Sequence, residues 1–92
     1  MFNYPTHLDY SVVSELENHV IEILNTCPNI DSLVSTAQPL YAWAGNILQK
    51  HPDELRHDLF THETHEHYPN LYLQEKDHLL KLPLILLEKI NN

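Results

Sequence analysis

Apolar side chains in the first third of the chain recur at steps of three and four residues. They are Val13, Leu16, Val20, Ile23, Leu24 and Cys27. This spacing is typical of an amphipathic helix that buries one face. Asp9 or Ser11 can cap the start of the helix, and its end must come before Pro28, because the residue preceding a proline avoids the helical region. The pattern therefore predicts a long first helix.

Prolines divide the next part of the chain into shorter segments. Proline is tolerated at a helix start but costs about 3 kcal/mol in a helix interior. We therefore expect a short helix over 31–37, another over 39–50, and a fourth that starts at Pro52 and ends between Thr61 and Tyr68. The residues expected to be buried in these segments are Leu33, Val34, Leu40, Trp43, Ala44, Ile47, Leu48, Leu55, Leu59 and Phe60.

A last helical segment is expected from Asn70, which can cap it, to Ile90. Its core candidates are Leu71, Leu79, Leu80, Leu84, Leu87 and Ile90. Pro83 should kink this segment or divide it in two, because a proline ring meets the carbonyl group four residues earlier. With Gly45 as the one glycine, a hairpin-rich β fold is hard to build. The sequence predicts an all-α fold, a small bundle of four to five helices in one domain, 1–92.

Charge changes this picture, because it is distributed unevenly. The chain has 13 acidic and 5 basic residues, a formal net charge of -8, and residues 1–49 contain no Lys or Arg. A surface that carries acids without interspersed bases repels nucleic acid and anionic membranes and attracts basic protein surfaces. We therefore expect no direct binding to nucleic acid or membrane. The partner expected is a basic protein, a nuclease or a nucleic-acid-binding complex, and solubility alone is the alternative use of the charge.

The expected partner-binding residues combine acids of the first half with one aromatic residue. They are Asp9, Glu15, Glu17, Glu22, Asp31 and Tyr41. Glu15 and Glu22 lie seven residues apart, nearly on one face of the first helix, while Glu17 diverges from them. Small size, acidity and the lack of a chemical motif are also the profile of phage proteins that block CRISPR or restriction complexes, and of immunity proteins that neutralise nuclease toxins. No motif of those proteins is matched, so no residue role is carried over.

Five of the eight histidines lie between residues 51 and 67. If that stretch is helical, Asp58, His62 and His65 share one face at the spacing that divalent metal ligands on a helix require. Zinc is the first expectation, with nickel or copper as alternatives. The zinc-protease motif H-E-x-x-H is absent, because two residues separate His62 from His65 where that motif has three. A solvated, His-rich loop is the competing interpretation, and we favour it.

No residue pattern indicates an enzyme. Cys27, the one cysteine, lies on the apolar stripe and is interpreted as a packing residue rather than a nucleophile. One cysteine forms no intramolecular disulfide, and neither a secretory signal nor a 20-residue apolar span is found, so we expect a cytoplasmic protein. The functional hypothesis is a small acidic inhibitor. The alternatives are a transition-metal-binding protein and a structural subunit that forms a homodimer through its Leu-rich C-terminal helix.

Overall fold

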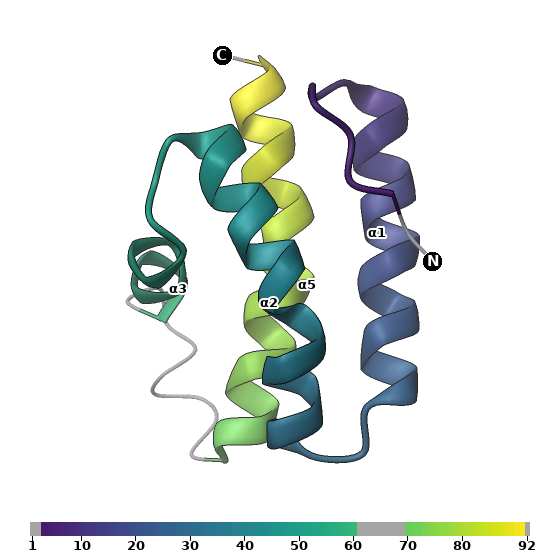
Figure 1. Ribbon diagram of the computed structural model, residues 1–92, viewed down its shortest axis with the longest axis vertical. Helices are drawn as coiled ribbons and strands as arrows, with labels where there is room; N and C mark the ends of the chain where they lie inside the picture. The colour runs from purple at the N-terminus through teal and green to yellow at the C-terminus, as the bar shows by residue number, and fades with distance from the viewer. Residues whose placement is uncertain (1–2, 61–69, 92) are drawn as a thin grey trace.

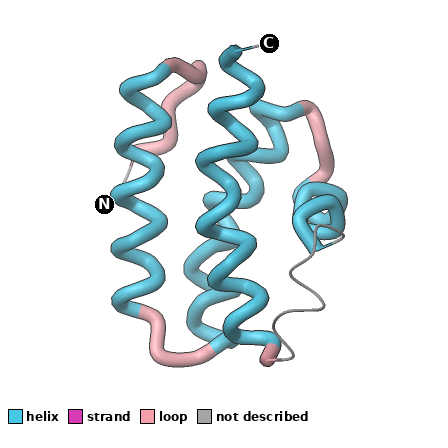
Figure 2. The backbone as a smooth tube through the Cα atoms, turned by 180° about the vertical axis from the view of Figure 1, so that it is seen from behind, coloured by secondary structure: helices cyan, strands magenta, loops and turns pink. Residues whose placement is uncertain are grey.

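A computed structural model describes residues 3–60 and 70–91 of the chain. Within these residues there are four α-helices and no strand, which confirms the predicted all-α fold (Figure 1). The helices are α1 (Tyr10–Thr26), α2 (Ile30–Leu48), α3 (Pro52–Phe60) and α5 (Leu71–Asn91). The long helices α1, α2 and α5 lie side by side, with α1 antiparallel to the other two, and the short α3 packs beside α2 and α5 (Figure 2). None of the described helices is long and apolar enough to cross a membrane.

The first helix follows the prediction closely. Asp9 caps α1, because its carboxylate accepts a hydrogen bond of 2.9 Å from the Val12 N–H. The last helical hydrogen bond is donated by the Cys27 N–H to the Ile23 carbonyl, directly before Pro28. The buried residues of α1 are Val12, Val13, Leu16, Val20 and Ile23, and Cys27 is buried beside them. The one-sided apolar stripe thus sets which face of α1 meets the core.

The predicted break at Pro39 is absent, so the prediction of two helices over 31–37 and 39–50 was wrong. One helix, α2, runs from Ile30 to Leu48 with Pro39 inside it. Pro39 and Ser35 are exposed, so water can satisfy the carbonyl group that the missing N–H leaves unbonded. The buried face is continuous across the proline, through Leu33, Ala37, Leu40 and Ala44. Burial of this stripe outweighs the local cost of the proline.

Gly45 permits the tight connection between α2 and α3. A Cβ atom added there would lie 2.6 Å from the carbonyl oxygen of Lys50, a distance that real Cβ atoms do not show. The Lys50 N–H donates a 2.7 Å hydrogen bond to the Gly45 carbonyl, and Gln49 takes a left-handed conformation with φ of 58°. The glycine therefore serves this turn.

The start of α3 at Pro52 and the burial of Leu55 and Leu59 are as predicted. The side chain of Phe60 and the expected end of this helix between Thr61 and Tyr68 lie outside the described residues. Asn70 caps α5 as predicted, accepting a 2.8 Å hydrogen bond from the Tyr72 N–H. Pro83 lies inside α5 without dividing it.

The buried face of α5 differs from the predicted one. Its buried residues are Gln74, Glu75, His78, Leu79, Leu82, Pro83 and Leu86. Of the predicted core residues, Leu79 is buried, Leu87 and Ile90 are half-buried, and Leu71, Leu80 and Leu84 are exposed. The end of α5 is apolar nearly all round, so its periodicity does not select one face.

Candidate functional site

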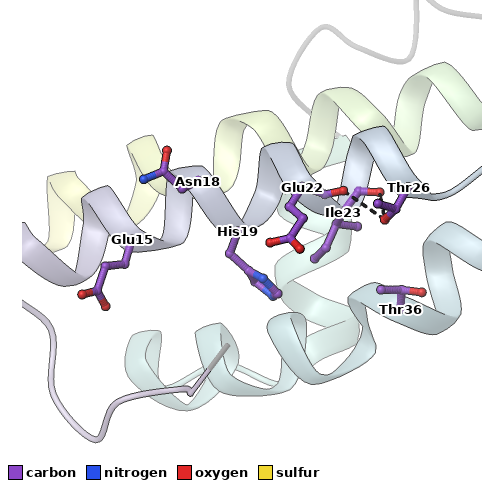
Figure 3. Close-up of a pocket in the computed structure, with 7 residues that line it drawn as sticks. All are labelled: Glu15, Asn18, His19, Glu22, Ile23, Thr26 and Thr36. Carbon is purple, nitrogen blue, oxygen red and sulfur yellow. Dashed lines mark hydrogen bonds between the residues drawn. The ribbon is translucent and has the colours of Figure 1, made fainter. Parts of the chain in front are cut away.

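A groove of about 530 Å³ runs along α1 on the side toward α2 (Figure 3). Its lining comes from one flank of α1 and one residue of α2: Glu15, Asn18, His19, Glu22, Ile23, Thr26 and Thr36. Two helical turns separate Glu15 from Glu22, so the predicted pair of carboxylates meets at one groove. Both are exposed, and neither forms an ion pair with any described residue. The groove therefore carries uncompensated negative charge.

The other predicted acids lie apart from this groove. Glu17 is on the opposite flank of α1, where it lines a separate groove beside α5, in agreement with its predicted divergence from Glu15 and Glu22. Asp31 is exposed in the first turn of α2. The carboxylate of Asp9 caps α1, and the hydrogen bonds it accepts from Ser11 and Val12 hold its pKa below the ordinary range. The predicted acids thus form no single patch.

His19 lies in the groove between the two carboxylates and was not foreseen from the sequence. Its ring points from α1 toward α2 (Figure 3). Its Nε2 atom is 3.1 Å from the Tyr4 hydroxyl. Partial burial lowers the pKa of His19 below its ordinary value of 6.5, although the carboxylate of Glu22 opposes this shift. His19 is therefore mainly neutral near pH 7 and leaves the charge of Glu15 and Glu22 intact.

The N-terminal segment, residues 3–9, is held against α1 and α2. The rings of Tyr4 and His19 meet edge to face with centroids 5.7 Å apart, and the centroids of Tyr4 and Trp43 are 5.8 Å apart. The indole Nε1–H of Trp43 donates a hydrogen bond of 2.6 Å to the Pro5 carbonyl. Trp43 is 8% exposed, which confirms its predicted place in the core. Tyr4 of this segment therefore contacts both His19 in the groove and Trp43 in the core.

None of the five basic residues lies on α1, and most are already engaged. The pairs are Lys50 with Asp58, Arg56 with Glu75, Lys81 with Asp77, and Lys76 with the ring of Tyr72. All of these partners belong to α3, to α5 or to the turn before α3. Among the described residues, most bases of α3, of α5 and of the turn before α3 are thus paired, whereas Glu15 and Glu22 of α1 are not.

The prediction of Tyr41 as a surface contact was wrong. Its side chain is 5% exposed, and the Arg56 guanidinium lies over its ring at 5.6 Å. Burial raises the pKa of the Tyr41 hydroxyl, and the nearby Glu75 carboxylate adds to this shift. Tyr41 follows Ala37 by four residues and precedes Ala44 by three, so it belongs to the buried stripe of α2.

A buried charged cluster joins α3 and α5, and it was not predicted from the sequence. Glu75 and His78 of α5 are 2% and 0% exposed, and their Oε2 and Nδ1 atoms are 3.6 Å apart. Arg56 of α3 forms an ion pair with Glu75. Burial alone would raise the pKa of Glu75, but the adjacent His78 ring and the charge of Arg56 more than offset it, so this pKa lies below its ordinary value. Glu75 is ionised inside the fold.

The predicted metal ligands are only partly described. His62 and His65 lie outside the described residues, while Asp58 of α3 binds Lys50, whose hydrogen bond lowers the pKa of Asp58. Among residues 3–60 and 70–91, no group of three His, Cys, Asp or Glu side chains is placed to hold a metal ion. A zinc site at Asp58, His62 and His65 stays a prediction.

Comparison of the chain with protein-family models, with curated proteins and with solved structures found no match. A small helical bundle does not imply a function by itself, because unrelated activities share such folds. The function must therefore be inferred from the shape and charge of the surface.

Proposed function

We propose that this protein is a binding module that docks the groove of α1 on a basic surface of a partner protein. The observation that carries the proposal is the contrast in pairing: Glu15 and Glu22 form no ion pair within the described residues, whereas most bases are engaged around α3 and α5. Charges at a surface are screened over about 10 Å in 0.1 M salt, so bases that are already engaged on other elements neutralise this groove little. A field of one sign steers a complementary partner and raises its association rate.

The partner class that fits this groove is a nuclease or another nucleic-acid-binding protein. Such proteins present Lys and Arg in a cleft that binds phosphates, and Arg also forms bidentate pairs with carboxylates. Glu15 and Glu22 lie about 10 Å apart along the axis of α1, so each can meet a separate cation. Occupation of the cleft excludes nucleic acid. The protein would then act as a cytoplasmic inhibitor, in the manner of phage anti-defence or toxin immunity proteins.

An affinity-capture experiment tests this proposal. The wild-type protein and the double variant Glu15→Gln/Glu22→Gln serve as baits in a lysate of the source cells, and bound proteins are quantified by mass spectrometry in about 50 and 200 mM salt. We expect a basic, nucleic-acid-processing protein that the wild type retains and the double variant loses. The added salt should weaken its capture.

The matched control is Asp53→Asn/Glu54→Gln in the first turn of α3. It removes the same charge away from the groove, and it costs the favourable interaction with the helix dipole, about 0.3–1 kcal/mol for each residue, together with an exposed contact between Asp53 and His51. The control should capture the same protein as the wild type. Equal capture by both double variants, or a captured set without basic proteins, would contradict the proposal.

A further inference from the structure

A second groove lies on the opposite flank of α1, beside α5, and its walls are mainly apolar. It has a volume of about 260 Å³ and is lined by Glu17, Val20, Ile21, Leu80, Pro83 and Leu84. Three of these side chains face solvent, with exposed fractions of 51% for Ile21, 51% for Leu80 and 59% for Leu84. Single exposed apolar residues are ordinary, but a cluster of them around a groove is typical of an interaction site.

The apolar surface continues along α5. Leu73 is 44% exposed and precedes Leu80 by seven residues, and Leu84 follows Leu80 by four. This spacing places the three leucines on one face of α5, opposite the buried Leu82. From Leu73 to Leu84 the stripe extends about 16 Å along the axis of α5. A partner helix of about three turns has the same length. An amphipathic helix binds such a surface through apolar side chains at i, i+3 or i+4, and i+7.

The charge at the rim of this groove favours a cationic partner over a second copy of the chain. Glu17 lines the groove, and the exposed Glu88 follows Leu84 by one turn. The neighbouring base Lys81 is engaged by Asp77 at 3.4 Å. A second copy of a chain with a net charge of -8 would bring further acidic residues to this rim, whereas a cationic partner would neutralise it.

We infer that this α1–α5 groove binds an amphipathic basic helix of the partner protein. Aliphatic side chains of that helix fill the space between Ile21, Leu80 and Leu84, and flanking Lys or Arg residues pair with Glu17 and Glu88. The inference rests on the proposed function, because it assumes the same basic partner. It adds an apolar anchor on the flank of α1 that faces away from Glu15 and Glu22.

An NMR titration of the full-length, ¹⁵N-labelled protein tests this inference with three synthetic peptides of equal length. One is an amphipathic helix of Leu and Lys, one is its Leu and Glu counterpart, and one contains Lys and Ser and has no apolar face. We expect the Leu/Lys peptide to shift the amide signals of Ile21, Leu80 and Leu84. We expect the Leu/Glu peptide to leave them unchanged.

Two variants with matched chemistry assign the binding to this groove. Leu80→Gln/Leu84→Gln should weaken binding of the Leu/Lys peptide by about tenfold, because two partly buried leucines are lost from the contact. Leu71→Gln, an exposed leucine of α5 outside the groove, should leave the affinity unchanged. All three leucines are more than half exposed, so circular dichroism should show that both variants fold.

The Lys/Ser peptide separates this inference from the proposed function. If it shifts the signals of Glu15 and Glu22 while the Leu/Lys peptide leaves Ile21, Leu80 and Leu84 unmoved, the proposed function survives and the inference is overturned. If neither basic peptide binds, both are overturned. Equal binding of the Leu/Glu peptide also overturns the inference. So does a concentration-dependent dimer that Leu80→Gln/Leu84→Gln abolishes in light scattering, because a second copy would then be the occupant.

Discussion

Carboxylates are used in opposite ways on the two sides of this molecule. Glu75 is buried between α3 and α5, where Arg56 and His78 keep it ionised. Glu15 and Glu22 are exposed on α1 and have no cationic partner among the described residues. A buried charge is costly unless it is paired, so the first environment links charge to stability. An exposed, unpaired charge contributes little to folding and remains available for binding.

The largest effect is expected from Glu75→Gln. Removal of one partner from a buried ion pair leaves the other charge uncompensated, which should lower the free energy of unfolding by about 3 kcal/mol. Urea denaturation followed by circular dichroism measures this change. Glu22→Gln is the exposed counterpart and should change stability by less than about 0.5 kcal/mol. Similar losses for the two variants would show that the contrast between the two environments is wrong.

The next effect concerns binding rather than stability. Glu15→Gln/Glu22→Gln should weaken binding to the Lys/Ser peptide by about tenfold, because two charge-assisted contacts of modest strength are lost. Isothermal titration calorimetry at low salt measures the affinity. Asp53→Asn/Glu54→Gln has the same change in net charge and should retain most of the affinity. If affinity instead follows net charge alone, the α1 groove has no special role.

Acid should lower the stability of the protein through the buried Glu75. The pKa of Glu75 is lower in the folded protein than its ordinary value of 4.5, so its contribution to stability is complete above about pH 4.5 and is lost as the pH falls through the folded pKa. Urea midpoints measured from pH 6 down to pH 3 should therefore fall more steeply for the wild type than for Glu75→Gln. Parallel curves would indicate that other carboxylates dominate acid unfolding.

The smallest effect is expected at His19. Its pKa is lower in the folded protein than the ordinary 6.5, so the unfolded chain takes up the proton first and stability declines as the pH falls below about 6.5. His19→Gln should reduce this decline as the pH falls below about 6.5. Protonation of His19 in the folded protein also adds a positive charge beside Glu22, so binding of the Lys/Ser peptide should weaken as the pH falls through this lowered pKa. A peptide affinity that does not change with pH would contradict the placement of His19 in the docking groove.

The helices that were predicted well are those whose sequence pattern is compatible with one buried face and one pair of ends. In α1 the apolar residues lie on one face of the helix, and Asp9 and Pro28 mark its two ends. In α2 the break expected at Pro39 did not occur, because a stripe buried on both sides of the proline outweighs a single lost hydrogen bond. In α5 the apolar residues surround the helix, so only packing against the other helices determines that Leu82 is buried and Leu80 is exposed.

The candidate site was predicted in part for similar reasons. The seven-residue spacing of Glu15 and Glu22 was sufficient to bring them to one groove, since helix geometry alone relates them. His19 was missed because a single histidine forms no motif, and its contact with Tyr4 depends on how the N-terminal segment folds back. The Glu75 cluster was missed because its partner Arg56 lies 19 residues away on another helix.

Trp43 is the one tryptophan of the chain, and its indole lies between the N-terminal segment and the core. Tyr4 contacts both this indole and the His19 ring at the groove. The tryptophan fluorescence of the protein therefore arises at a single position, two side chains from Glu22. A partner that displaces Tyr4 when it enters the groove would shift this emission, which supplies a label-free optical signal for binding in the unmodified chain.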